Sequence, residues 1–413
     1  MLIDWAENGQ QRSSPLLTSG TTKPPTRIEI VNDRLRADVA LRLASEGTGM
    51  LWRGDFVNAR QLLDALKRRL DRIDVKPAET PAVTFHRLRQ AKAHRTRILS
   101  MLLIEVGPAY QIDLTRAPDV QAACQEVFGD SSGPVLVSLQ ELLGMIGASE
   151  WRRRGVVIPA LDARIHPHYG VFAPTRNEYV DLVANAEWPQ AEVDRAPATA
   201  AEVDRAPVSV SAATTVDTAF EPTTVDTAFE PTTVDTAFDI GTGTGVLAAL
   251  LVRRGVRHVV ATDIEPRAVE CARDNMRRLE MANQVEVLQA DLYPPGRADL
   301  VVCNPPWVPA TPTSTLEKGV FDRRSQMLSR LISDLPNHLT EHGECWLVLS
   351  DLAERLGLRS REQFIDMLDQ AGLSVAGRLH TSPRHPRALD GQDPLASIRA
   401  AEVVTLWRLR AKP

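Results

Sequence analysis

The sequence is sparing in cysteine and has no long run of apolar side chains. Its four cysteines are spread over 413 residues without paired spacing, so the pattern predicts neither a metal site nor a disulfide framework and favours a reducing compartment. No stretch reaches the roughly 18 uninterrupted apolar residues that a membrane span requires. With Asp4 and Glu7 near its start, the chain also lacks the basic and then apolar order of a signal peptide. We therefore expect a soluble, cytoplasmic protein without a membrane partner.

A large excess of charge of one sign is missing as well. The formal net charge is -5 and the pI is near 6.0, so the charge of the whole chain gives no reason to expect a nucleic-acid partner. The charge is unevenly distributed, however. Residues 51–100 hold twelve Lys and Arg against five Asp and Glu, whereas residues 186–236 hold ten acidic side chains against two arginines. A chain of this length accommodates two domains plus linkers.

Before residue 186 the sequence divides into a tail and a domain. Residues 1–30 are polar and rich in Ser, Thr and Pro, which predicts a flexible tail. Residues 31–185 carry mixed patterns, and we expect an N-terminal substrate-recognition domain that is mixed but mainly helical. Helical periodicity falls at residues 33–46, 57–74, 84–104 and 136–149, and a short alternation predicts a strand at 110–114.

Residues 186–235 contain short repeats. The decapeptide AEVDRAPATA at 191–200 is nearly repeated directly after it, and TTVDTAFEP at 214–222 occurs three times in succession, the last copy with a different end. Units this short and polar cannot bury a hydrophobic face as solenoid repeats do. We interpret them as an acidic, extended linker, of which only the third nonapeptide runs on into a core strand.

From residue 236 onward, strand and helix patterns alternate regularly. Strands joined by helical crossovers of this length form a parallel sheet with helices on both faces. Since no helical pattern separates the last two strands, we expect the sheet to end with an antiparallel strand. The prediction for residues 236–413 is an α/β, doubly wound, seven-stranded and mostly parallel sheet of the Rossmann-like type. Its strands are expected at 236–240, 258–263, 285–290, 299–303, 344–350, 373–380 and 402–410.

Three glycines, Gly241, Gly243 and Gly245, follow the first of these strands. Glycine lets the backbone approach a ligand closely, and the helix that follows presents free N–H groups. The Gly-x-Gly-x-Gly spacing differs from the Gly-x-Gly-x-x-Gly fingerprint of dinucleotide sites. The run therefore predicts a nucleotide-like ligand, with a plain tight turn as the alternative.

Two aspartates end the next two strands. Asp263 stands where such folds place the carboxylate that accepts the ribose hydroxyls, although it could equally cap the helix that begins at Pro266. Asp291 ends the third strand, where it could hold an adenine amino group or form a turn before Pro294.

The sequence Asn304-Pro305-Pro306-Trp307 follows the apolar fourth strand, at a carboxyl end of the sheet where ligands bind. An aryl or amide NH2 is a poor nucleophile because its lone pair is delocalised. The Asn304 side-chain oxygen and the Pro305 carbonyl, which the prolines hold in a set direction, could accept its two N–H bonds. Trp307 could stack on the planar group. The motif predicts chemistry at an amino nitrogen by positioning and electrostatics, with a Pro-Pro turn as the alternative.

In these motifs residues 236–413 resemble the class I S-adenosylmethionine-dependent methyltransferases that carry an Asn-Pro-Pro-aromatic signature. That group includes enzymes that methylate amino groups of adenine and guanine in nucleic acids, and the release-factor glutamine methyltransferases. The resemblance implies S-adenosylmethionine as cofactor and a catalytic role for Asn304, Pro305, Pro306 and Trp307. The donor-binding positions that it implies are Asp239, Gly241, Thr242, Gly243, Gly245, Asp263, Ile264, Asp291 and Leu292.

A segment before the repeats, residues 170–179, resembles the stretch that covers the donor in several of these enzymes. Its functional residues would be Phe172, Pro174, Arg176 and Glu178, with Phe172 and Arg176 as further donor contacts. This chain departs from the usual pattern, because about 55 residues separate the segment from its sheet where a short link is usual.

Basic residues outside these motifs have two interpretations. The helix expected at 84–104 presents either a nucleic-acid footprint or a solvated face. Its basic residues are Arg87, Arg89, Lys92, Arg95 and Arg97.

Two further features are weaker. The loop 382–397 should share the ligand face, and its Arg384, His385 and Arg387 could meet phosphates or lie in a solvated turn. His166-Pro167-His168 has no third ligand at metal spacing and is interpreted as a structural turn.

Three functions are compatible with these features. The first is a methyltransferase acting on an amino nitrogen of a nucleic-acid base in ribosomal or transfer RNA. The second keeps the chemistry but uses a glutamine amide of a protein as acceptor. The third is a donor-binding regulatory protein without catalysis, which the intact Asn-Pro-Pro-Trp sequence argues against because donor binding does not require it.

Overall fold

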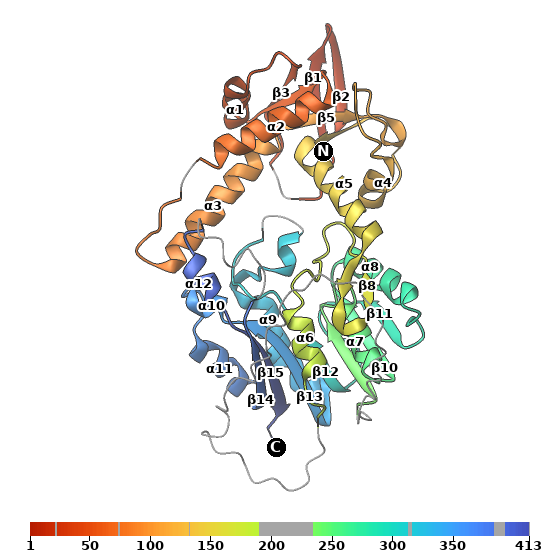
Figure 1. Ribbon diagram of the computed structural model, residues 1–413, viewed down its shortest axis with the longest axis vertical. Coiled ribbons are helices and arrows are strands. Elements are labelled where there is room, and N and C mark those ends of the chain that lie inside the picture. The colour runs from red at the N-terminus through yellow and green to blue at the C-terminus, as the bar shows by residue number, and fades with distance from the viewer. Residues whose placement is uncertain are drawn as a thin grey trace, which may run out of the picture.

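The structure is a computed structural model that describes residues 1–20, 23–72, 75–131, 133–189, 234–312, 316–383 and 393–412. Figure 1 shows two regions, an N-terminal one coloured red to yellow above a C-terminal one coloured green to blue. Most of the predicted linker, residues 186–235, lies outside the described residues, so our interpretation of the repeats stays a prediction.

A seven-stranded sheet forms the centre of the C-terminal region, with strand order β11-β10-β9-β12-β13-β15-β14. Neighbouring strands from β11 to β13 run parallel, and β15 is antiparallel to both β13 and β14. The carboxyl ends of β9 to β12 therefore meet at one edge. Each strand lies close to its predicted position, except that β13 begins five residues early. The strands are β9 (Thr236–Ile240), β10 (His258–Asp263), β11 (Val285–Gln289), β12 (Ala298–Cys303), β13 (Leu339–Ser350), β14 (Leu373–Thr381) and β15 (Val404–Ala411).

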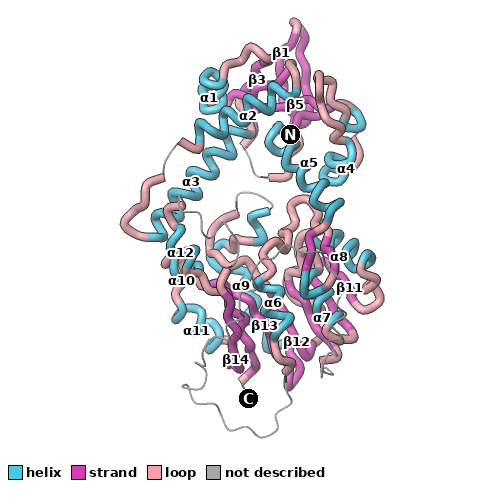
Figure 2. Tube along the Cα trace, viewed as in Figure 1, coloured by secondary structure: helices cyan, strands magenta, loops and turns pink. Residues whose placement is uncertain are grey.

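Helices cover both faces of this sheet (Figure 2). On one face α6, α7 and α8 bury Val183, Leu250 and Met276 against the strands, and on the other face α9 and α11 bury Leu331 and Phe364. Each helix supplies a stripe of apolar side chains at three- and four-residue intervals. The helices are α6 (Glu178–Asn185), α7 (Val246–Arg253), α8 (Pro266–Arg278), α9 (Gln326–His338), α10 (Leu352–Arg355), α11 (Arg361–Gln370) and α12 (Ala396–Ala400).

A smaller sheet, β3-β4-β5-β6, forms the N-terminal region. Its first three strands are parallel and β6 is antiparallel. Helices pack on one face, and the β1–β2 hairpin covers the other by placing Ile3 and Trp5 against Leu51, Leu103 and Leu136. The elements are β1 (Leu2–Glu7), β2 (Gln10–Pro15), β3 (Arg27–Val31), α1 (Ala37–Ser45), β4 (Thr48–Trp52), α2 (Phe56–Leu70), α3 (Pro81–Leu99), β5 (Leu102–Val106), α4 (Gln121–Phe128), β6 (Val135–Ser138) and α5 (Leu139–Arg154).

Three predictions for this region are wrong. Residues 1–30 are not a flexible tail, because β1 buries Trp5 and β3 joins the sheet. The helices expected at 84–104 and 136–149 each run into a strand, β5 at the end of the first and β6 at the start of the second. Residues 110–114, all of them described, form no strand. Buried strands of a small parallel sheet are apolar on both faces, so periodicity does not separate them from the ends of helices.

The domain boundary predicted at residue 185 is also wrong, because residues 156–189 belong to the C-terminal core. The hairpin β7 (Val156–Ile158) and β8 (Ala163–Ile165), together with α6, buries apolar side chains in the same cluster as strand β9. Arg254 holds the end of this segment: its guanidinium lies 4.0 Å from the Trp188 ring and donates to the carbonyls of Val183 and Ala186. Burial lowers the pKa of Arg254 to about 10. One hydrophobic core is therefore built from two segments of the chain, and the repeats lie between these segments in the sequence.

Two of the contacts between the described parts of the two regions involve α3 and α4 (Figure 1). α3 reaches the loop after β12, where Phe85 packs with Val308 and Leu352. α4 lies against α8, where Arg267 donates to the Val127 carbonyl at 2.5 Å. Since the loop after β12 and the start of α8 both lie at the carboxyl edge of the large sheet, the N-terminal region stands over that edge. Among the described helices, none is both long and apolar enough to cross a bilayer.

Candidate active site

A cavity of about 400 Å³ lies at the carboxyl ends of β9 to β12, a volume typical of small-molecule sites. Residues from four strand ends and from the covering segment meet in it. The predicted site residues that line it are Phe172, Asp239, Gly241, Thr242, Gly243, Asp263, Ile264, Asp291, Leu292, Asn304 and Pro306.

The glycine turn leaves room on the cavity side. Gly241, Gly243 and Gly245 all have positive φ, at 70°, 55° and 81°, which L side chains rarely adopt. A Cβ on Gly243 would meet nothing within 4 Å, whereas a Cβ on Gly245 would come within 2.9 Å of the Met276 side chain. Gly245 is buried and, among the described residues, is not part of the cavity wall. It permits close packing of α7 on α8, and the donor contact predicted for Gly245 stays a prediction.

Asp239 holds the turn against the helix that follows. Its carboxylate accepts from the Thr242 hydroxyl at 2.6 Å and from the Ala248 N–H at 3.0 Å. Burial raises the pKa of Asp239 to about 6, although these two hydrogen bonds work in the opposite direction. Its main role in the structure is thus to fix the shape of the cavity floor.

Asp263 ties the glycine turn to the start of α8, and the ribose contact predicted for it stays a prediction. One carboxylate oxygen accepts from the Gly243 N–H and the other from the Glu265 N–H, each at 3.0 Å. Burial raises its pKa, and these backbone bonds lower it. A carboxylate has about four lone-pair positions, so two are left to accept hydroxyl groups from the cavity. Ile264 beside it is 56% exposed, an apolar side chain that a ligand in the cavity would cover.

Asp291 is engaged by a residue that sequence reasoning missed. Arg330 of α9 donates to both of its carboxylate oxygens, at 3.1 and 2.8 Å. Both side chains are more than half exposed, so the pair lies at the mouth of the cavity, where the predicted contact with an adenine amino group stays a prediction. Leu292 has φ 75° and its carbonyl accepts from the Thr262 hydroxyl at 2.6 Å.

The Asn-Pro-Pro-Trp motif faces the same cavity through only two of its residues. Asn304 and Pro306 line it, whereas Pro305 is buried and Trp307 is half-buried against three apolar clusters. The Trp307 indole N–H donates to the Asn304 Oδ1 at 2.9 Å. The stacking platform that we predicted for Trp307 is therefore occupied in part by the protein's own core.

Of the two residues of the covering segment predicted to contact the donor, Phe172 lines the cavity. Its side chain packs so closely on Gly319 that a Cβ there would come within 2.9 Å of it. Arg176 lies outside the cavity wall as far as the described residues define it, and its guanidinium is 3.6 Å from the buried carboxylate of Glu402. Glu402, more than 200 positions later in the chain, holds the Arg176 side chain, and the donor contact predicted for Arg176 stays a prediction.

Residues 318–330 supply the part of the cavity wall that the sequence did not predict. Lys318 forms an ion pair with Glu265 at 2.7 Å across the cavity mouth. Asp322 accepts from the Met327 and Leu328 N–H groups at 3.1 Å each and so caps α9. The only sequence signal for this wall was its position directly after the Asn-Pro-Pro-Trp motif.

The basic side chains of α3 hold this loop. Arg89 donates to the Thr311 carbonyl and to Glu317, and its guanidinium lies 3.8 Å from the centre of the Phe321 ring. Lys92 lies 2.7 Å from Glu317, and Arg95 lies 2.9 Å from Asp71. Three of the five basic residues predicted as a nucleic-acid footprint therefore have acidic partners within the chain.

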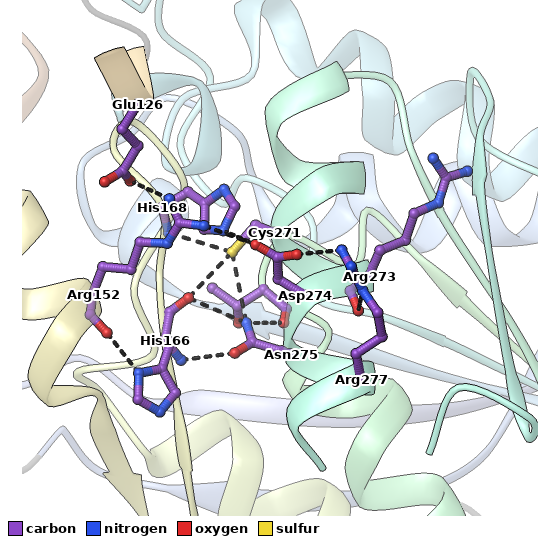
Figure 3. A network of polar contacts seen from close by, with 10 residues as sticks. Glu126, Arg152, His166, His168, Cys271, Arg273, Asp274, Asn275 and Arg277 are labelled. Atoms are coloured by element: carbon purple, nitrogen blue, oxygen red, sulfur yellow. Dashed lines mark hydrogen bonds and ion pairs between the residues drawn. The ribbon is translucent and has the colours of Figure 1, made fainter. Parts of the chain in front are cut away.

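On the other side of the molecule a polar network joins the N-terminal region to α8 (Figure 3). Arg152 of α5 bridges Glu126 of α4 at 2.9 Å and Asp274 of α8 at 2.8 Å. His168 lies 3.0 Å from the same Asp274 carboxylate, and burial lowers the pKa of His168. These contacts fix α8, which packs behind the glycine turn.

Asn275 extends this network to the turn itself. Its side-chain oxygen accepts from the His166 N–H at 2.8 Å, and its amide donates to the Thr244 carbonyl at 3.0 Å. The His166-Pro167-His168 segment is thus a structural connection, as we interpreted it. In the portion of the chain that the structure describes, no three His, Cys, Asp or Glu side chains are grouped to hold a metal ion. Arg384, His385 and Arg387 lie outside the described residues, so their role stays a prediction.

The strand order of the sheet, the cavity and the motif are similar to those of class I S-adenosylmethionine-dependent methyltransferase domains, a class whose cofactor is S-adenosylmethionine. Residues 209–358, about a third of the chain, match the family model of the methyltransferase small domain.

Relatives of this chain include methyltransferases that act on transfer RNA and on proteins according to their names. The tRNA1(Val) (adenine(37)-N6)-methyltransferase of Parabacteroides distasonis is 31% identical over 35% of this chain and 61% of its own length. The release factor glutamine methyltransferase of Cereibacter sphaeroides is 38% identical over 20% of this chain and 31% of its own length. Among solved structures, a ribosomal protein L11 methylase from Lactobacillus delbrueckii subsp. bulgaricus is 20% identical, with 45% of this chain and 73% of that chain covered at a TM-score of 0.30. The chain thus spans less than two thirds of the length of these curated relatives.

Proposed function

We propose that the protein transfers a methyl group from S-adenosylmethionine to an amino nitrogen of a base in transfer or ribosomal RNA. The observation that carries this proposal is that Asn304 lines the same cavity as Gly243 and Asp263. An amino-nitrogen motif and a nucleotide-type turn in one cavity bring acceptor and donor into contact, and such positioning is a large part of catalysis.

The residues of the cavity fit this donor. The positive-φ glycines let the donor approach the backbone closely because they carry no side chains, and Asp263 has lone pairs left for the two ribose hydroxyls. Asp239 and Thr242 keep the turn in shape, and Phe172 covers the cavity from the side of the N-terminal segment. When bound, S-adenosylmethionine supplies an electrophilic methyl group on a positively charged sulfur.

The acceptor side depends on Asn304. Its Oδ1 would accept an N–H of the acceptor, so that the nitrogen lone pair becomes less delocalised and points at the donor. The Pro305 carbonyl is the candidate for the second N–H. Because both groups are fixed before the reaction, they stabilise the developing geometry without reorganisation.

The choice of RNA rests on the relatives and on the class, and not on α3. The relative whose name specifies a transfer-RNA adenine matches 35% of the chain, against 28% and 20% for two relatives named as glutamine methyltransferases. The neutralised basic residues of α3 give no separate support for a phosphate contact. A protein glutamine amide is the second candidate, because two relatives are named for it. Either acceptor would place the protein in the cytoplasm.

The test separates the acceptors by the enzyme that destroys the labelled product. The full chain is incubated with methyl-labelled S-adenosylmethionine and an extract of cells that lack the protein, and the product is divided between nuclease and protease. Label lost to nuclease supports the proposal, and label lost to protease moves it to the glutamine type. No label in either fraction, together with intact binding of S-adenosylhomocysteine, would favour the non-catalytic function. Initial rates at rising salt provide a second criterion, since phosphate contacts weaken steeply with ionic strength.

A further inference from the structure

Trp307 is bound to the residue on which the proposed chemistry depends. Its indole N–H donates to the Asn304 Oδ1 at 2.9 Å. The ring itself packs against the clusters on both faces of the large sheet and against the cluster that contains Phe85 and Leu352. A ring held on several sides provides a fixed donor, and not a mobile one.

The chemistry of the two side chains makes this bond directional. An indole nitrogen can only donate, whereas an amide has an accepting oxygen at one end and a donating NH2 at the other. The indole therefore accepts only one orientation of the Asn304 amide, the one with Oδ1 towards Trp307. If the Asn304 amide were flipped by 180°, its NH2 would face the indole N–H of Trp307. Two donors would then meet, and the half-buried indole N–H would lose its acceptor, which costs free energy.

The bond also limits what Asn304 can do for an acceptor. Oδ1 has two lone pairs, and Trp307 occupies one of them, which leaves one for a single N–H of the incoming group. The second N–H must then find another acceptor, and we assign this role to the carbonyl of the neighbouring Pro305, a residue that is itself buried.

We infer that Trp307 is a positioning residue, which orients the Asn304 amide through its indole N–H so that one Oδ1 lone pair faces the acceptor nitrogen. This inference rests on the proposed function. It differs from a stacking role in one measurable respect, because stacking needs the ring alone and positioning needs the N–H.

The kinetic test uses Trp307→Phe, which keeps an aromatic ring and removes the donor. We expect kcat to fall about 10- to 100-fold, the scale of a small misplacement of a catalytic group. KM for total RNA from cells that lack the protein, and the Kd for S-adenosylhomocysteine, should stay within about threefold. Trp151→Phe is the matched control, because Trp151 is 52% exposed and lies in α5 of the N-terminal region. A raised KM with unchanged kcat, or no change in either, would overturn the inference in favour of stacking or of no role.

A second variant guards against a cavity left by the smaller ring. Site-specific replacement of Trp307 by 3-benzothienylalanine keeps the size and shape of the indole and replaces its N–H by sulfur. The same loss of kcat is expected, and normal kcat would contradict the inference even if Trp307→Phe were unstable.

A spectroscopic test is independent of any acceptor. Among the indole N–H resonances of the seven tryptophans, that of Trp307 is assigned by its absence in Trp307→Phe. It should show slow exchange with solvent and should shift on Asn304→Ala. An unchanged resonance in Asn304→Ala would show that the bond is not formed in solution and would overturn the inference. If the Trp307 resonance shifts on Asn304→Ala but the wild-type protein transfers no methyl group, the proposed function is refuted and the hydrogen bond is confirmed.

Discussion

The two sheets of this protein differ in how the polar and charged residues at their strand ends are surrounded. In the C-terminal sheet, Asp263 and Asn304 follow β10 and β12 and line a cavity. In the N-terminal sheet, Arg53 follows β4, and two carboxylates of the chain bind its guanidinium. Glu7 accepts hydrogen bonds from it at 2.7 and 2.8 Å, and Glu105 lies 2.7 Å away. Arg53 holds the pKa of Glu7 at about 2. In this protein, the residues at the ends of parallel strands line a cavity only where the surrounding side chains leave space beside them.

The difference assigns separate tasks to the two regions. The C-terminal region carries the cavity, and the N-terminal region holds two parts of its surroundings, the loop after β12 through Arg89 and helix α8 through Arg152. Variants on either side of this division should therefore fail in different ways.

The largest effect is expected from Asn304→Ala. Transfer should fall by about 100- to 1000-fold, as when a single preorganised hydrogen-bonding group is removed from an active site. The Kd for S-adenosylhomocysteine should change less than about threefold, because Asn304 is proposed to touch only the acceptor. Initial rates and titration calorimetry measure the two quantities. A large loss of donor binding would show that the cavity is not divided as we propose.

Asp263→Asn should do the reverse. The amide keeps the size of the side chain but loses the charge and one acceptor, so the Kd for S-adenosylhomocysteine should rise about 10- to 100-fold, the value of hydrogen bonds to a charged group. Asp299→Asn is the control, since Asp299 also accepts backbone N–H groups but lies at the opposite end of β12. Equal donor affinity in both variants would remove Asp263 from the donor site.

Arg89→Ala tests whether the N-terminal region shapes the cavity wall. Without its bonds to the Thr311 carbonyl and Glu317, the loop should become more mobile and turnover should fall about tenfold, a change of about 1.4 kcal/mol. Limited proteolysis of the loop should accelerate in parallel. Arg87→Ala, two positions away on the exposed side of the same helix, should behave as wild type. If both variants do so, the two regions function independently.

The smallest effect concerns stability and pH at Asp239. Because burial raises its folded pKa from 3.8 to about 6, the folded state holds the proton more tightly than the unfolded state, and stability is lost as pH rises from about 4 to 6. Asp239→Asn removes this dependence. Its free energy of unfolding relative to wild type should increase by up to about 2 to 3 kcal/mol between pH 4 and pH 7.5, measured by urea unfolding. If the difference in unfolding free energy between the variant and wild type does not change with pH, the pKa of Asp239 is not raised in the folded state.

The strands of the C-terminal region could be predicted from the sequence, whereas several strands of the N-terminal region could not. In the C-terminal region the strands were found within a few residues, because strand and helix patterns alternate and each strand end carries a punctuating Gly, Asp or Asn-Pro. In the N-terminal region the buried strands β5 and β6 adjoin helices without such punctuation, so their apolar residues extended the helical pattern. The hairpin with Trp5 was mistaken for a tail because its polar residues lie on the solvent side of the strands.

The site itself divides in the same way. The sequence alone determined the residues at the strand ends, Gly241, Gly243, Asp263 and Asn304, because parallel strands bring their carboxyl ends to one edge whatever lies between them. Tertiary structure decided the partners: Glu402 binds Arg176, Arg330 binds Asp291, and the N-terminal α3 holds the loop beyond the motif. It also decided that residues 156–189 and 234–412 share one core across the repeats. Such contacts depend on packing between segments far apart in the chain, and no local pattern records them.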